Sequence, residues 1–229
     1  MKHSKISAIR NMQFISNFKL SIIFLLCYAL AVGGITVALF LTGSLSDLFF
    51  QVDTFVIATK VFLIILGAVT FYSTFKDYIL QGVTRKEYVV GSLTAIAILC
   101  IFFTAVLTVV YLTVQTMKNV NIIVDDFVIL MTASLVIFFA YYVIGWFLGM
   151  AYLKYKIIGQ TISFIFAVIA IVLMELTTNI GFSSLVEGIE ITSPTSIPLI
   201  YNLLSTVIIA FLFTYYVYSK AKKIYIRVD

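Results

Sequence analysis

Two ionisable side chains lie inside long apolar runs, and they are the residues of this chain best placed to do chemistry. Lys60 is about six residues into the run 54–75, and Glu175 is near the end of the run 157–176. A lysine near the centre of a membrane helix costs about 3 kcal/mol, so it needs a physical reason. The two residues could form a charge pair that contacts substrate or latches a gate. Alternatively, Lys60 extends its amine to the interface without a partner, and we favour this second interpretation.

The segment between the second and third apolar runs carries turn and cap signals. It spans 76–88 and reads KDYILQGVTRKEY. Gly82 suits a break in the backbone, and Thr84 with Glu87 has the spacing of a capping box. We therefore expect a helix, a turn at Gly82 and then the start of the next span. An exposed helix here could dock on a partner, although from spacing alone an ordinary solvated hairpin is the better interpretation.

No catalytic or metal-binding set is evident in the sequence. The single histidine, His3, is near the first residue, and no His/Cys/Asp/Glu cluster has metal-ligand spacing. Cys27 and Cys100 both lie in apolar runs, where packing is a better interpretation than a disulfide. The chain has no G-x-x-x-x-G-K-[ST] sequence and hence no phosphate-binding loop. We expect neither catalytic residues nor a bound metal or cofactor, so the chain is not expected to be an enzyme.

The composition indicates what surrounds these residues. The chain has 229 residues, of which 62% are hydrophobic and 11% charged, whereas soluble domains carry roughly 25% charged residues. A span needs about 20 mostly apolar residues, and six runs qualify: 20–41, 54–75, 89–114, 127–150, 157–176 and 198–219. We therefore predict an all-α membrane protein with a single transmembrane domain over 1–229 and about six spans.

The basic residues predict the orientation. Thirteen of the fifteen Lys and Arg residues fall in the two terminal segments and in the second and fourth loops: Lys2, Lys5, Arg10, Lys19, Lys76, Arg85, Lys86, Lys154, Lys156, Lys220, Lys222, Lys223 and Arg227. Short cytoplasmic loops are enriched in these residues. We expect a multi-pass plasma-membrane protein with both termini in the cytoplasm. Because the basic clusters are short and separate apolar runs, nucleic acid is not an expected partner.

Three further segments have structural interpretations. Residues 1–19 combine apolar positions near helical spacing with basic ones, which predicts an amphipathic helix along the membrane interface. Gly145 and Gly149 form a G-x-x-x-G pattern, for which packing within the chain is favoured over a dimer seam. Trp146, Tyr152 and Tyr155 are placed for an aromatic belt. The segment 177–197 is expected to dip partly into the outer leaflet.

One local motif carries a resemblance to a known family. The octapeptide QGVTRKEY, residues 81–88, is similar to the loop after the second span in ABC-2-type exporter permeases. The layout over the whole chain also resembles that family, whose fold is the type V exporter fold. The small, Ile- and Phe-rich chain further resembles the membrane subunits of phenol-soluble-modulin exporters and of lantibiotic immunity transporters of Gram-positive bacteria.

The resemblance implies a permease that exports amphipathic or hydrophobic peptides from a bacterial cell, as in resistance to antimicrobial peptides. It implies two copies of a separate ATPase that binds ATP and Mg²⁺, and a second permease, itself or a relative. The family's ATPase-coupling helix would correspond here to Tyr78, Gln81, Gly82, Val83, Thr84, Arg85, Lys86 and Glu87. A secondary transporter or channel and a non-transporting assembly subunit remain alternative hypotheses.

Overall fold

The computed structural model describes residues 2–42, 50–117, 124–155, 157–186 and 199–221. They form six helices: α1 (Lys2–Thr42), α2 (Phe50–Leu80), α3 (Arg85–Met117), α4 (Val124–Lys154), α5 (Ile157–Val186) and α6 (Leu199–Ala221). Each helix contains a stretch long and apolar enough to cross a bilayer: Lys5–Gly33, Thr54–Leu80, Arg85–Thr113, Met131–Lys154, Ile157–Glu175 and Leu203–Ala221. The predicted all-α membrane fold with six candidate spans is confirmed for these residues.

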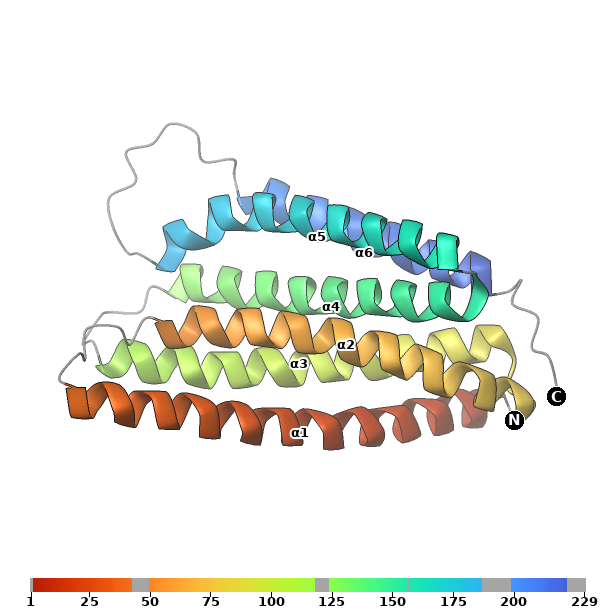
Figure 1. Cartoon of the computed structure of the whole chain (residues 1–229), viewed down its shortest axis with the longest axis horizontal. Coiled ribbons are helices and arrows are strands. Elements are labelled where there is room, and N and C mark those ends of the chain that lie inside the picture. The colour runs from red at the N-terminus through yellow and green to blue at the C-terminus, as the bar shows by residue number, and fades with distance from the viewer. Residues whose placement is uncertain (1, 43–49, 118–123, 156, 187–198, 222–229) are drawn as a thin grey trace.

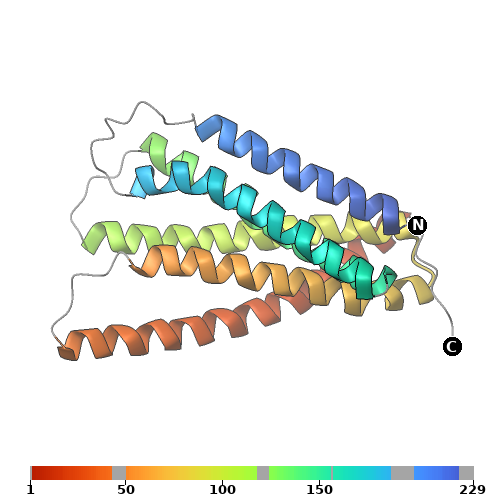
Figure 2. The same cartoon turned by 45° about the horizontal axis from the view of Figure 1, so that its top comes forward.

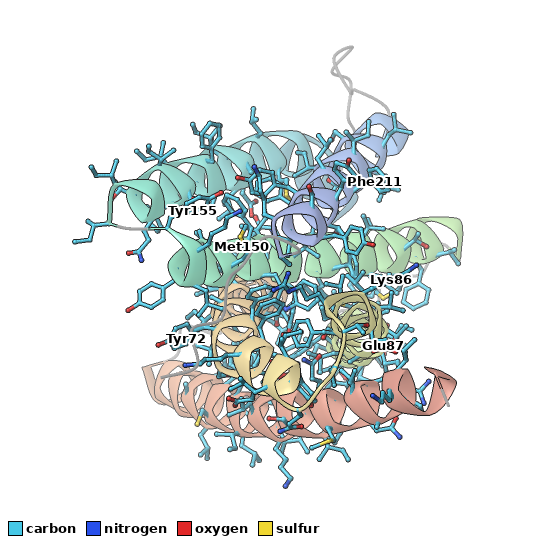
Figure 3. All side chains as sticks on the ribbon, turned by 90° about the vertical axis from the view of Figure 1, so that its right-hand side faces the viewer. Tyr72, Lys86, Glu87, Met150, Tyr155 and Phe211 are labelled. Carbon is cyan, nitrogen blue, oxygen red and sulfur yellow. The ribbon has the colours of Figure 1, made fainter. Side chains whose placement is uncertain are left out.

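The helices run alongside one another, with the start of α1, the α2–α3 turn and the end of α6 at the same end of the bundle (Figure 1). We call this end the basic end, because the described residues there include Lys5, Lys76, Arg85, Lys86, Lys154 and Lys220. In a second view α1 and α6 again lie on opposite sides of the bundle (Figure 2). Viewed from the basic end, α4 separates α5 and α6 from α1, α2 and α3 (Figure 3).

The N-terminal segment is not the separate interfacial helix that we predicted. It is the first part of α1, a single helix of 41 residues, because the sequence has no Gly or Pro before Gly33 to break it. Its candidate span begins at Lys5 rather than at residue 20. Pairs along α1 fix its antiparallel register on α2: Gln13 with Thr74, Phe24 with Phe62, and Tyr28 with Phe55.

A buried polar stripe on α1 explains why this segment joins the bundle. Gln13, Asn17 and Ser21 recur every four residues, so they share one helix face, and all three are buried. Asn17 donates to the Tyr142 hydroxyl at 3.1 Å and accepts from the Thr70 hydroxyl at 3.0 Å. Hydrogen bonds of this kind hold membrane helices together. Part of the segment that we predicted to lie along the membrane interface therefore faces protein through Asn17.

Glycines allow the backbones of α2 and α4 to come together. A side chain at Gly145 would meet the carbonyl oxygen of Ile64, and one at Gly149 would meet that of Ala68. On the facing helix, a side chain at Gly67 would meet the backbone of α4. Small residues permit such close approach between membrane helices. The prediction that the G-x-x-x-G pattern serves packing within the chain is confirmed.

An aromatic cluster fills the space between α2, α3 and α4 near the basic end. Trp146 is fully buried and lies 5.6 Å from the Phe71 ring and 6.1 Å from the Tyr88 ring, centroid to centroid. Its predicted place in an interfacial belt is therefore wrong, because its side chain points into the helix contact. Tyr152 is 58% exposed, as a belt residue should be.

The helices extend further into the connecting segments than we predicted. Residues 76–80 belong to α2, 85–88 belong to α3, and 177–186 continue α5. Residues 76–80 and 85–88 continue their helices because no Gly or Pro interrupts either stretch. The rest of the segment that we expected to dip into the outer leaflet, residues 187–197, lies outside the described residues.

The α2–α4 contact makes a prediction about stability. Gly145→Ala should lower the unfolding midpoint in detergent, because the new methyl group must displace the Ile64 carbonyl, and such overpacking costs about 1–3 kcal/mol. Gly33→Ala is the matched control, since nothing lies within 4 Å of a side chain there. Equal midpoints for Gly145→Ala and Gly33→Ala would contradict this account of the contact.

Candidate functional site

Three helices meet at a charged group within the apolar part of the bundle. Lys60 of α2 donates from Nζ to Glu175 Oε1 of α5 at 2.7 Å. Tyr141 of α4 donates its hydroxyl to the same oxygen, and the Lys60 amine lies 5.4 Å from the centre of the Tyr141 ring. The favoured interpretation of a lysine without a partner is therefore wrong. The alternative, a Lys60–Glu175 pair, is the arrangement that the structure contains.

The surroundings of this group make the pair a strong link. The Lys60 side chain is 11% exposed and that of Glu175 is 33% exposed. In surroundings with little water, opposite charges attract strongly and a lone charge is costly. The Tyr141 hydroxyl and ring supply a further hydrogen bond and a cation–π contact. We call Lys60, Glu175 and Tyr141 the charged triad. It can fasten α5 to the core of the bundle, or a charged ligand can replace one member of the ion pair and bind the other.

The predicted coupling segment forms a tight turn between two long helices. α2 ends at Leu80, α3 begins at Arg85, and Gly82 in between has φ +79°. That backbone angle favours glycine over residues with a side chain. The Val83 amide donates to the Tyr78 carbonyl at 3.0 Å and closes the end of α2. The predicted order of helix, turn at Gly82 and next helix is confirmed, and the segment forms the tip of a helical hairpin without a separate short helix.

The predicted capping box at the start of α3 is confirmed. The Glu87 carboxylate accepts from the Thr84 amide at 3.0 Å and from its hydroxyl at 2.7 Å. In return, the Glu87 amide donates to the Thr84 hydroxyl at 3.3 Å. The reciprocal bonds satisfy backbone groups that the first turn of a helix leaves without partners. The turn is therefore held in one shape.

The eight predicted coupling residues divide into two groups. Tyr78 and Glu87 are buried, and the Tyr78 ring packs on the Tyr88 ring with centroids 5.8 Å apart. Both residues hold the hairpin together and present little surface to a partner. Val83 and Arg85 are half-buried, whereas the exposed members are Gln81, Gly82, Thr84 and Lys86. A partner protein at the basic end would therefore meet the second group.

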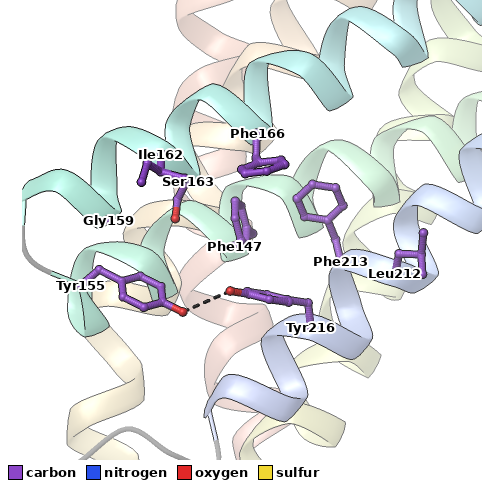
Figure 4. Close-up of a pocket in the computed structure, with 9 residues that line it drawn as sticks. All are labelled: Phe147, Tyr155, Gly159, Ile162, Ser163, Phe166, Leu212, Phe213 and Tyr216. Carbon is purple, nitrogen blue, oxygen red and sulfur yellow. Dashed lines mark hydrogen bonds between the residues drawn. The ribbon is translucent and has the colours of Figure 1, made fainter.

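A further site, which sequence reasoning missed, is an apolar groove between α5 and α6. The groove has a volume of about 590 Å³ and is lined by Phe147, Tyr155, Gly159, Ile162, Ser163, Phe166, Leu212, Phe213 and Tyr216 (Figure 4). The spacing of 159, 162, 163 and 166 places them on one face of α5. That spacing is a signal in the sequence, but aromatic and apolar residues facing lipid have the same pattern.

The tyrosine pair at one end of the groove is fixed by local structure. The hydroxyls of Tyr155 and Tyr216 are hydrogen-bonded at 3.1 Å. Gly159 leaves room for the Tyr155 side chain, since a Cβ there would lie 2.6 Å from Tyr155 Cβ. Gln160 donates to the Tyr155 carbonyl at 3.0 Å and so holds the α4–α5 connection. Burial, and to a smaller extent the contact with Tyr216, raise the pKa of Tyr155 to about 12. Its hydroxyl therefore keeps its proton at neutral pH.

Metal and disulfide chemistry find no support among the described residues. They contain no cluster of three His, Cys, Asp or Glu side chains that could hold a metal ion. Cys27 is exposed and Cys100 is buried, and both are free thiols. Packing, the interpretation that we favoured for both cysteines, fits the buried Cys100 but not the exposed Cys27.

Comparison of the chain with protein-family models, with curated proteins and with solved structures gave no match in any of the three cases. The geometry of the charged triad, the hairpin tip and the groove therefore carries the functional argument.

The charged triad makes a prediction about stability. Lys60→Met should destabilise the bundle by about 2 kcal/mol, less than the 3–5 kcal/mol of a fully buried pair because Glu175 is partly exposed. Lys76→Met, an exposed position on the same helix, is the matched control. The exchanged pair Lys60→Glu with Glu175→Lys should recover part of the loss. Unfolding in detergent is the measurement, and equal stability of both Met variants would refute the link.

Proposed function

We propose that this chain is the transmembrane permease subunit of an ATP-driven exporter. In this proposal two copies of a separate ATPase bind and hydrolyse ATP with Mg²⁺, and a second permease, either the same chain or a relative, completes the transport path. The six candidate spans suit a membrane subunit. The sequence contains no phosphate-binding loop, which suits a subunit that depends on another chain for its energy.

The shape of the hairpin tip is the observation that carries the proposal. A subunit that couples to an ATPase needs a surface that protrudes, keeps its shape and connects directly to a spanning helix. The tip at 81–84 is exposed and held by the capping box. It continues directly into α2, which packs closely on α4 through Gly67 and Gly145. A push on the tip would therefore reach the centre of the bundle through a rigid helix.

The basic end would face the cytoplasm of a bacterial cell. Lys76, Lys86 and Lys154 all lie there, and an excess of Lys and Arg is typical of cytoplasmic loops. This orientation places the hairpin tip on the side where ATP is available. It also places both ends of the chain in the cytoplasm.

The proposed substrate class rests on the exposed helix faces. Many exposed side chains of α1, α2 and α5 are aliphatic or aromatic, for example Leu30, Ile65 and Phe164, although Lys19 and Cys27 on α1 are exposed as well. A path built between two such subunits would suit an amphipathic or hydrophobic peptide better than an ion or a sugar. Peptide export is accordingly the proposed activity.

A secondary transporter is the second candidate, and the charged triad is the observation that favours it. Transporters driven by ion gradients place ionisable groups within their spans. Here Lys60 and Glu175 neutralise each other at 2.7 Å, which suits a structural link more than an ion path. Transport that needs an ion gradient and no ATPase would support this second candidate.

A pull-down from solubilised membranes tests the proposed ATPase coupling. The variant Leu80→Ser, Gln81→Ser and Lys86→Ser removes exposed side chains around the tip and leaves the capping box intact. We expect the native chain to recover a nucleotide-binding subunit in equal amounts, and the variant to lose most of it, because the contact surface is gone.

The matched control changes three similar exposed side chains on α1: Met12→Ser, Asn11→Ser and Lys5→Ser. This control should keep the ATPase. Absence of an ATPase with the native chain would argue against the exporter assignment and favour the transporter or assembly-subunit hypothesis. Equal loss in both variants would mean that the hairpin tip is not the contact.

A further inference from the structure

The groove between α5 and α6 has a polar end and an apolar body. Tyr155 and Tyr216 lie at its basic end, and from there the lining follows α5 through Ile162 to Phe166. Along α5 the lining runs from Gly159 to Phe166, which corresponds to about 10 Å of groove at 1.5 Å per residue. The volume of about 590 Å³ falls within the 300–1,000 Å³ that is usual for ligand sites.

Two lysines lie beside the tyrosine pair at the polar end, one against each ring. Lys154 Nζ lies 5.4 Å from the centre of the Tyr155 ring, and Lys220 Nζ lies 5.4 Å from the centre of the Tyr216 ring. The hydroxyls of Tyr155 and Tyr216 are hydrogen-bonded to each other at 3.1 Å (Figure 4). Two cations and two hydroxyls at one end of an apolar slot complement an anion that is joined to a long apolar tail.

The geometry points to a binding site for an anionic phospholipid, and we propose that such a lipid occupies this groove. Its phosphate would lie among Lys154, Lys220 and the Tyr155–Tyr216 hydroxyls, and one acyl chain would extend past Ile162 toward Phe166. Basic pockets between membrane helices on the cytoplasmic side are known to bind anionic head groups. This inference does not depend on the exporter assignment.

A peptide would fit the same groove poorly. Each residue of a peptide brings one N–H and one C=O group that must be satisfied away from water. Along the body of the groove, Ser163 is the one polar side chain among the described lining residues. An acyl chain brings no polar groups and therefore suits aromatic and aliphatic walls. The charges at the end then select the head group.

Native mass spectrometry of the full chain in detergent tests the proposal. The probes are phosphatidylglycerol and phosphatidylcholine with the same acyl chains. We expect about tenfold preferential retention of phosphatidylglycerol, because each nearby lysine strengthens attraction to an anionic head group. The double variant Lys154→Gln with Lys220→Gln should lose that preference. The matched control, Lys76→Gln with Lys86→Gln, makes the same charge change at the same end and should keep it.

A second pair of variants tests the apolar body. Ser163→Trp should fill the groove and reduce retention of both lipids, whereas Phe164→Trp, on an exposed position of the same helix, should not. Glycerol phosphate, which lacks acyl chains, should fail to displace the bound lipid.

Three results would overturn the proposal. Equal retention of the two lipids would mean that the head group is not selected. Equal loss in both double-lysine variants would mean that the attraction belongs to the whole basic end. Displacement of the lipid by an added amphipathic peptide would assign the groove to peptide.

Discussion

The close contact between the backbones of α2 and α4 is the constraint on which the rest of this structure depends. Gly67 on one helix and Gly145 and Gly149 on the other leave no room for side chains. At the glycines the contact is stabilised by dispersion between closely packed atoms, and elsewhere along the same pair of helices the Lys60 amine lies 5.4 Å from the centre of the Tyr141 ring. Because the two helices are in such intimate contact, the orientation of α4 about its own axis is fixed. Several other features of the bundle are reached from particular faces of α4.

Four aromatic side chains on α4 show the consequence of that fixed orientation. Tyr141 reaches the charged triad, and Tyr142 reaches the polar stripe of α1 through Asn17. Trp146 completes the aromatic cluster with α2 and α3, and Phe147 lines the groove between α5 and α6. Successive residues of a helix point about 100° apart, since a turn takes 3.6 residues. Rotation of α4 by one residue would therefore misplace all four contacts together.

The features predicted correctly from the sequence have short-range causes. The spans follow from runs of apolar residues, and the capping box follows from Thr84 and Glu87 at a spacing of three. The long-range features were harder to predict. Glu175 is 115 residues away from Lys60, so the sequence offered their pairing only as one of two interpretations, and a lysine without a partner was the favoured one. The burial of Asn17 could not be predicted, because in a membrane a polar residue can face either protein or head groups, and spacing does not distinguish them.

Polar links hold α5 to the bundle, because this helix buries few large apolar side chains. Its outer side chains, such as Ile158, Phe166 and Val172, are exposed, and its buried stripe is made of smaller residues such as Ser163, Ala167 and Ala170. Little apolar burial therefore holds it to α4, and in a membrane apolar contact with lipid is no worse than contact with protein. Polar links near the two ends of its candidate span add to the weak packing. Glu175 bonds to Lys60 and Tyr141 near one end. Gln160 bonds to the Tyr155 carbonyl near the other. Displacement of α5 would accordingly break these specific polar bonds while little apolar packing is lost.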